Sequence, residues 1–325
     1  MSFMIDPSRP LNSEISRIIR EECNRAITEL SDTKSDRHEA LHEIRKGLKR
    51  IRALLRLIRA GDRAFSKAEN ARYREIAARL SHARDAGALV ETVDRLANGD
   101  AAGLAALRDG LAERRDRIVG EGDDSAEMIA GVLARFHVGI KAAGSVNLAD
   151  DRKKAAQILA SGLERNLRHA WKSIRRAEKH GGPEDFHELR KAAKDHAMHL
   201  ELAALVWPGR TTKRLSAAKK LGDKLGELND IAVMRHVLET EGAEIAPETE
   251  IQSLQQRMKK KQKSLSRTCL ANARRLFDIS PGKVAKKVAL NYRQAQSRPD
   301  RASSNGQMPS LPRLERSLSA TDRKA

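Results

Sequence analysis

The chain has 325 residues, and its 63 Lys and Arg outnumber its 44 Asp and Glu, which gives a formal net charge of +19. Such an excess attracts polyanions, whether nucleic acid, a polyphosphate or an anionic membrane surface. Aromatic residues make up only 3 % of the chain. Because readers of single-stranded nucleic acid stack the bases on aromatic side chains, the composition favours a partner that is bound through its phosphates.

The cysteine positions and the hydropathy of the chain indicate the cellular compartment. Cys23 and Cys269 lie far apart and outside any spacing typical of metal ligands, so we expect reduced thiols and a reducing compartment. The N-terminus has no charged start followed by an apolar run, and no stretch approaches the about 20 apolar residues of a spanning helix. We therefore expect a soluble, cytoplasmic protein without a membrane partner, in an oligomeric state that the sequence does not fix.

Apolar residues recur at helical spacing along almost the whole chain, and the alternation typical of strands is absent, so we predict an all-α protein. Gly and Pro pairs such as Gly61-Asp62, Gly181-Gly182-Pro183 and Pro208-Gly209 separate the helices. The residues from 296 to 325, rich in Ser, Pro and Arg, are expected to form a disordered basic tail. The expected helices cover residues 11–30, 37–60, 67–97, 101–119, 125–142, 153–180, 184–206, 212–240, 246–278 and 281–295.

The second half of the chain repeats the first at an offset of 145 residues. Residues 42–49 (HEIRKGLK) and 187–194 (HELRKAAK) are identical at five of eight positions. The repeat predicts two antiparallel helical bundles of the four-helix type, over residues 8–145 and 151–295, related by a pseudo-two-fold axis. The same register, without a gap, pairs Leu80 with Leu225, Asp85 with Asp230, Arg20 with Arg165, Arg74 with Lys219 and Arg79 with Lys224.

The helix that follows Arg37 carries two stripes, which run side by side. Alternating steps of four and three residues place an apolar core stripe on one face: Ile44, Leu48, Ile51, Leu55 and Ile58. The neighbouring stripe consists of potential cations: His42, Arg45, Lys49, Arg52 and Arg56. Like charges one turn apart repel and weaken an isolated helix, and a bound polyanion would offset this repulsion. The alternative is a solvated charged face, which is what most charge runs are.

The second copy keeps only part of this basic stripe. His187, Arg190 and Lys194 stand at the expected positions, but Ala197 and Glu201 replace the last two arginines. We expect the next helix to complete the basic surface there, through Lys213, Arg214, Lys219, Lys220 and Lys224.

The two histidines, His42 and His187, have two interpretations. Each imidazole could contact phosphate, more strongly when it is protonated. Each could instead be held by a carboxylate such as Asp85 or Asp230 and orient the helices. The two roles are compatible, because a nearby carboxylate raises the pKa of an imidazole.

Residues 38–42 (HEALH) match the HExxH pattern of zinc proteases, and Glu39 with His42 match the ExxH pattern of di-iron bundles. A match of five residues in a helix rich in Ala, Leu and Glu is weak. Pro183 stands at the repeat equivalent of His38, and nearby Arg45 would oppose a divalent cation. We therefore expect no metal site and no catalytic residues.

Several of these elements together resemble a known family. The pattern His-x-Leu/Ile-Arg-Lys-x-x-Lys, present at residues 42–49 and 187–194, looks like the CHAD domain, the conserved histidine α-helical domain. Residues 80–86 (LSHARDA) and 225–231 (LGELNDI) resemble the family's Leu-Gly-x-x-Arg-Asp element. Residues 280–292 resemble its closing helix, so the resemblance extends over nearly the whole folded part of the chain.

The resemblance implies paired bundles whose basic surface binds inorganic polyphosphate, without a cofactor, and a place at polyphosphate granules in the cytoplasm. The contacts that it implies are His42, Arg45, Lys49, Arg52, His187, Arg190 and Lys194. The stripes and the offset pairs extend the candidate set to Lys46, Arg56, Lys191, Arg20, Arg165, Arg79, Lys219 and Lys224, with Asp85 and Asp230 as orienting residues. We thus expect a binding protein and no enzyme; the alternatives are a nucleic-acid-binding protein and, third, a metal-dependent phosphohydrolase.

Overall fold

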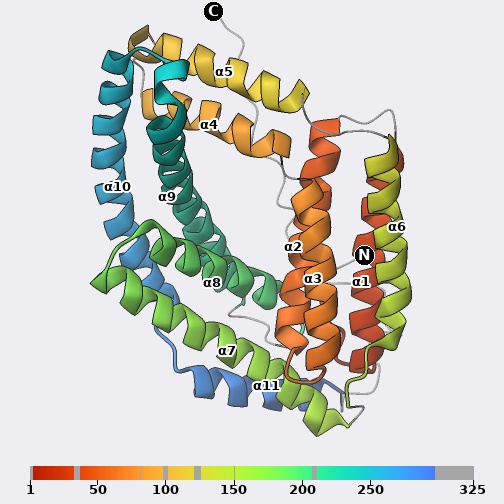
Figure 1. The fold of residues 1–325 in the computed structure, drawn as a ribbon. Coiled ribbons are helices and arrows are strands. Elements are labelled where there is room, and N and C mark those ends of the chain that lie inside the picture. Colours follow the sequence, from red (N-terminus) through yellow and green to blue (C-terminus); the bar gives the residue numbers. More distant parts are fainter. Residues whose placement is uncertain are drawn as a thin grey trace, which may run out of the picture.

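The computed structural model describes residues 3–32, 37–80, 82–97, 102–120, 126–149, 151–206 and 211–296. All regular structure in these ranges is helical, as predicted, and none of these helices is long and apolar enough to cross a membrane (Figure 1). The predicted tail lies outside the described residues. The α-helices are α1 (Leu11–Ser31), α2 (Arg37–Ile58), α3 (Arg63–Arg79), α4 (His82–Ala97), α5 (Ala105–Gly120), α6 (Ala126–Ala142), α7 (Arg152–Lys179), α8 (Pro183–Leu202), α9 (Thr211–Ile245), α10 (Glu248–Leu276) and α11 (Pro281–Gln296).

The helices α1, α2, α3 and α6 form a bundle in which each packs on two of the others (Figure 1). The apolar stripe predicted on α2 faces the core, because all five of its residues are at most 1 % exposed. Tyr73 of α3 is also fully buried, and its hydroxyl lies 3.4 Å from Cys23 Sγ of α1. Burial raises the pKa of the Cys23 thiol to about 12, so the thiol stays protonated in this core.

The second half packs in a related order. Helix α7 packs on α8 and α11, α8 packs on α9, and α9 packs on α10. The pair α1–α2 has a counterpart in α7–α8 near the offset of 145 residues, whereas α6 and α11, which pack on α1 and α7, begin 155 residues apart. Helices α4 and α5, which precede α6 in the chain, lie against α9 and α10 (Figure 1). The pseudo-two-fold axis itself stays a prediction.

The prediction of one continuous helix over residues 67–97 is wrong, because α3 ends at Arg79 and α4 begins at His82. The Leu80 carbonyl oxygen at the end of α3 accepts a hydrogen bond from Arg45 Nη1 of α2 at 3.2 Å. A guanidinium that donates to the last carbonyls of a helix satisfies groups that have no partner within the helix. The corresponding stretch of the second half, in α9, runs without a break.

Helix α2 joins the two halves, since it packs on both α7 and α8. At the crossing with α7 a glycine allows close approach: a Cβ atom at Gly162 would lie 2.1 Å from the Leu57 carbonyl oxygen. Nearby, Arg165 Nη1 of α7 donates to the Arg56 carbonyl oxygen at 3.5 Å, and His199 Nε2 of α8 donates to the Ala53 carbonyl oxygen at 3.0 Å. These contacts fix both α7 and α8 relative to α2.

We predict that Gly162→Ala lowers the free energy of unfolding by about 1–3 kcal/mol, as overpacking of a tight contact does. The atom that the new methyl group meets is backbone, which cannot move aside as a side chain could. Urea denaturation measures the change. Gly282→Ala is the matched control, because nothing lies within 4 Å of a Cβ atom there, and a change of about 0.5 kcal/mol or less is expected. Equal stabilities of the two variants would contradict the close crossing.

Candidate functional site

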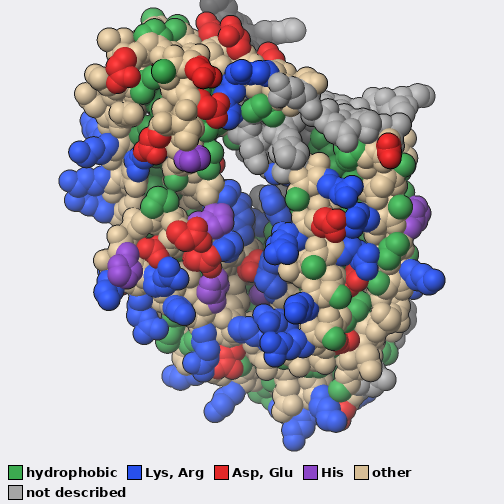
Figure 2. Space-filling model, viewed as in Figure 1, with side chains coloured by type: hydrophobic (Ala, Val, Ile, Leu, Met, Phe, Trp, Pro, Cys, Tyr) green, Lys and Arg blue, Asp and Glu red, His purple; other side chains and the backbone are tan. Residues whose placement is uncertain are grey.

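A cleft with a volume of about 520 Å³ lies between α2 and α8. Figure 2 shows Lys and Arg side chains gathered on both sides of the hollow between these helices. Among the described residues that line the cleft, six are Lys or Arg, two are His and one is acidic. The lining residues are Lys49, Arg52 and Arg56 of α2, His169 of α7, and His187, Arg190, Lys191, Lys194, Asp195 and Met198 of α8.

The α2 wall comes from the C-terminal part of the predicted basic stripe. Because the apolar stripe beside it is buried, Lys49, Arg52 and Arg56 are held at the edge of the core and point into the cleft. Arg52 Nε donates to Asn70 Oδ1 of α3 at 3.2 Å. Burial, together with repulsion from Arg56, lowers the pKa of the Arg52 guanidinium. The α2 wall therefore carries three cationic side chains, of which Arg56 is paired with Asp195 of α8.

The α8 wall rests on α9. His187 Nδ1 lies 2.9 Å from Asn229 Oδ1, an acceptor, so Nδ1 donates and the amide fixes the orientation of the ring. Two glycines of α9 make room for the longer cations. A Cβ atom at Gly226 would lie 3.3 Å from Arg190 Nη2, and one at Gly222 would lie 3.3 Å from Lys194 Cε. Because these two positions of α9 carry no side chain, Arg190 and Lys194 can lie directly against the α9 backbone.

The acidic groups at the cleft are already engaged. Asp195 is the one carboxylate among the described lining residues, and its Oδ1 accepts from Arg56 Nη2 at 2.6 Å. Glu188, which lies behind the wall, accepts from His169 Nε2 at 3.1 Å and forms an ion pair with Lys191. Burial opposes the ionisation of Glu188, but hydrogen bonds and attraction from Lys191 and His169 lower its pKa.

Two guanidinium groups of the cleft have unused donors. The Nε atoms of Arg56 and Arg190 are buried and have no hydrogen-bond partner among the described residues. A buried donor without a partner costs about 1–3 kcal/mol. Each wall of the cleft thus contains a guanidinium whose Nε has no acceptor among the described residues.

Comparison with known proteins identifies the family. The family model of the CHAD domain matches residues 17–239. The chain belongs to the CHAD-domain family. The crystal structure of the CHAD domain from the plant Ricinus communis has a similar fold, with a TM-score of 0.61 and 20 % sequence identity over 86 % of this chain and 95 % of that one. No curated protein matches the chain.

The N-terminal part of the basic stripe does not line the cleft of this CHAD domain. His42 is exposed, and Arg45 bonds to the Leu80 carbonyl oxygen at the end of α3. Lys46 points to solvent, where its Nζ donates to both carboxylate oxygens of Glu43 at 3.1 and 3.2 Å. The structure thus brings Lys49, but not these three residues, together with the α8 cations.

The candidates taken from the offset pairs are also spread apart. Arg20 is exposed on α1, and Arg79 forms an ion pair with Glu75 of its own helix at 3.7 Å. Lys219 lies 2.6 Å from Glu201 of α8, and Lys224 of α9 does not line the cleft either. Of these residues only Arg165 lies close by, through its bond to the Arg56 carbonyl oxygen. Burial and repulsion from Arg59 lower the pKa of Arg165.

The orienting residue of His187 differs from the expectation. Asp230 forms an ion pair with Arg95 of α4 at 3.0 Å, and its neighbour Asn229 holds the imidazole. An amide fixes the ring without adding a negative charge to the cleft. The side chains of Asp85 and His38 lie outside the described residues. Among the side chains that are described, no group of three or more His, Cys, Asp or Glu could hold a metal ion.

Sequence reasoning missed His169, Asp195 and Asn229. The position equivalent to His169 at the repeat offset is Asn24, so the comparison of the two halves gave no signal. Asp195 is set by its contact with Arg56, 139 residues away in the chain. A search for polar residues at helical spacing from Lys191 could have found Asp195, which lies four residues later, but not its partner.

Two buried histidines follow on α8, at the interface with α2 and α7. His196 and His199 are 1 % and 2 % exposed. His196 Nδ1 lies 3.1 Å from Asn166 Oδ1 of α7, and His199 Nε2 bonds to α2 as described above. Burial lowers the pKa of His196 to about 3 and that of His199 to about 4. Both imidazoles are therefore neutral in the folded protein at neutral pH.

We predict that acid destabilises the interface through these histidines. In the unfolded chain they bind protons near pH 6.5, while in the folded chain they do so only below pH 4. Their contribution is full above pH 6.5, and each histidine lowers the free energy of unfolding by up to about 1.4 kcal/mol per pH unit below it. Urea denaturation at pH 7, 6 and 5 should show a smaller decline for His199→Gln than for the wild type. The same decline in both would contradict this role.

Proposed function

We propose that this CHAD domain binds inorganic polyphosphate in the cleft between α2 and α8 and does not hydrolyse it. The observation that carries the proposal is the cleft itself, which gathers six Lys and Arg from two helices around one carboxylate that is already bound to Arg56. The family resemblance of the basic stripes points to the same ligand.

The chemistry of the ligand fits the cleft. A linear polyphosphate carries a negative charge on each phosphate and has no side groups, so it can pass between two walls of cations. Arginine presents a planar fork of donors to phosphate oxygens, and charge-assisted hydrogen bonds of this kind are about twice as strong as neutral ones. Arg52 and Arg56 on one wall and Arg190 on the other provide such forks. A single orthophosphate would engage few of them, so long chains should bind more tightly.

Nucleic acid is the competing polyanion, and the cleft offers its bases little. None of the described lining residues is Phe, Tyr or Trp. Stacking on an aromatic side chain stabilises a bound base by about 1–3 kcal/mol, and this gain is absent in the cleft. Bound bases would have to be accommodated without this stacking energy, whereas an inorganic chain has no bases.

Binding of polyphosphate would also place the protein at polyphosphate granules, which we propose as its location.

The test is a double variant that removes one guanidinium from each wall. We predict that Arg52→Gln with Arg190→Gln weakens the binding of long-chain polyphosphate about 100-fold, because two charge-assisted contacts of about 1.5 kcal/mol each are lost. Isothermal titration calorimetry in physiological salt measures the affinity, and circular dichroism confirms the helicity of the variant.

Lys153→Gln with Lys154→Gln is the matched control, since both lysines are exposed at the start of α7 and outside the cleft. It removes the same net charge, and a loss of less than about threefold is expected from long-range screening alone. Equal losses in the two double variants would show that net charge, and not the cleft, binds the chain.

A second prediction distinguishes the residues of the basic stripe that line the cleft from those that do not. Lys46 and Lys49 lie on the same helix, but only Lys49 lines the cleft, and Lys46 is paired with Glu43. In single strands, each phosphate contact contributes about 0.7 to the slope of log K against log salt concentration. Lys49→Gln should therefore make this slope shallower by about 0.7, because one contact is lost. Lys46→Gln should leave the slope unchanged. Fluorescence titrations at several salt concentrations measure the slopes, and the reverse order would exclude the assignment.

The absence of hydrolysis is tested directly. Long-chain polyphosphate is incubated with the protein in the presence of Mg²⁺, Mn²⁺ or Zn²⁺, and released orthophosphate is measured. If orthophosphate is released, and if both a chelator and His42→Ala abolish the release, the HExxH motif has a catalytic role. The protein would then be a hydrolase, and the binding proposal would be wrong.

A further inference from the structure

A second hollow, of about 330 Å³, lies between the N-terminal part of α9 and the C-terminal part of α10. None of the described residues that line it is acidic. The lining residues are Lys213, Arg214, Ala217 and Lys220 of α9, and Asn272, Arg275 and Leu276 of α10. Three of these cations, Lys213, Arg214 and Lys220, were expected to complete the basic surface of the second copy, but none of the described residues lines both this hollow and the cleft.

The two hollows lie on opposite sides of α9. Gly222 and Gly226 face the cleft, because Lys194 and Arg190 lie against them. Successive helical residues are about 100° apart, so Lys220 lies about 200° around the helix from Gly222. Lys213 lies seven residues before Lys220 and therefore on the same side. Helix α9 separates the cleft from the second hollow.

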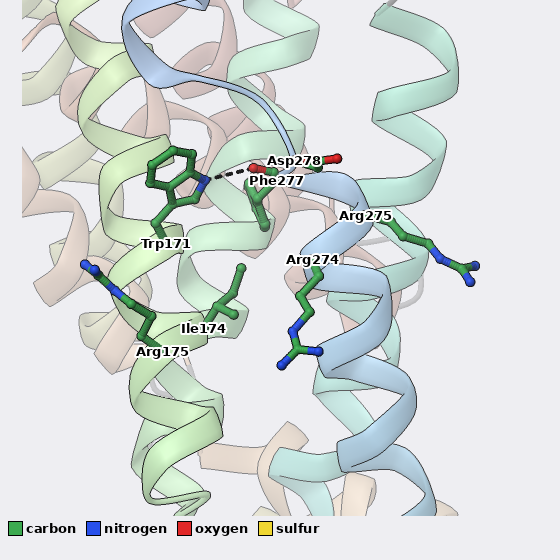
Figure 3. A pocket seen from close by; sticks show the side chains of 7 residues that line it. All are labelled: Trp171, Ile174, Arg175, Arg274, Arg275, Phe277 and Asp278. Atoms are coloured by element: carbon green, nitrogen blue, oxygen red, sulfur yellow. Dashed lines mark hydrogen bonds between the residues drawn. The ribbon is translucent and has the colours of Figure 1, made fainter.

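One of the four cations has a structural role. Arg214 Nη2 donates to the Leu276 carbonyl oxygen at the end of α10, a carbonyl without a partner within the helix. Lys213, Lys220 and Arg275 form no ion pair among the described residues. Arg275 also lines the neighbouring hollow beside Trp171, and Figure 3 shows that its side chain extends in the direction opposite to that of Trp171 and Ile174. Three cations thus surround the second hollow without an acidic partner.

The start of α9 adds to the positive potential. Lys213 is the third residue of the helix, and the first turn of α9 contains no acidic residue. A helix N-terminus carries about half a positive charge from its aligned peptide dipoles. Acidic residues are common in first turns because they offset that charge, and here cations occupy the turn instead. Such a site favours a compact, multiply charged anion.

We infer that Lys213, Lys220 and Arg275 form a second phosphate-binding site, which holds a further stretch of the polyphosphate chain bound in the cleft. The inference rests on the proposed function of the cleft. A chain long enough to pass around α9 reaches both sites, and the second contact is then intramolecular and occurs at high effective concentration. A chain too short to reach around α9 occupies the two sites independently. The protein thereby selects long chains.

The experiment compares long-chain polyphosphate with tripolyphosphate on the full chain, by isothermal titration calorimetry. The triple variant Lys213→Gln, Lys220→Gln and Arg275→Gln should bind the long chain about tenfold more weakly than the wild type, because the linked contact is lost. The number of tripolyphosphate ions bound per protein should fall from two to one. The variant Lys213→Arg, Lys220→Arg and Arg275→Lys keeps the charges and should retain both properties.

Lys259→Gln, Lys260→Gln and Lys263→Gln form the matched control, because these lysines are exposed on α10 outside the second hollow. This control should bind the long chain as the wild type does. If the triple variant at the second hollow keeps the long-chain affinity while the Arg52/Arg190 variant loses it, the second site is excluded and the cleft stands. If the wild type binds neither ligand, the proposed function fails and the inference with it.

Discussion

Repulsion among the cations of α2 and α8 is the constraint on which the rest of the structure depends. Six Lys and Arg line one cleft, and burial together with Arg56 lowers the pKa of Arg52. Because these cations repel one another, the two walls of the cleft stay in place only through attractive contacts elsewhere in the helices. The buried apolar stripe of α2 and the close crossing at Gly162 provide them. The cations of the two walls therefore repel one another, and under the proposed function a bound polyanion would relieve this repulsion.

The supporting residues explain why the walls keep their positive charge. Asn229, an amide, holds His187, and Gly222 and Gly226 make room for Lys194 and Arg190. None of these three residues adds negative charge to the cleft. Asp195, the one carboxylate among the described lining residues, is paired with Arg56, and this pair also ties α8 to α2. The cations of the cleft are thus oriented in advance, and under the proposed function a phosphate chain would meet a pre-organised site.

Much of this fold follows from the sequence because its signals are local. Helical periodicity placed the helices, and the two stripes of α2 distinguished the buried face from the basic one. Tertiary contacts decided the rest. At the break between α3 and α4, Arg45 reaches the Leu80 carbonyl oxygen from another helix. His42 and Lys46 share the stripe with Lys49, but only Lys49 lines the cleft, because α8 faces only the C-terminal part of α2. His169 joins the site from α7, and its repeat equivalent is a different residue.

The central claim is that the cleft recognises an inorganic phosphate chain and not polyanions in general. The most direct measurement is a titration of the wild-type protein with long-chain polyphosphate in physiological salt, with duplex DNA and orthophosphate as competitors at equal phosphate concentration. The account predicts tight binding that neither competitor displaces, because the cleft fits a chain without bases and engages many phosphates at once. Equal displacement by DNA would contradict it, and the cleft would then be a general basic surface.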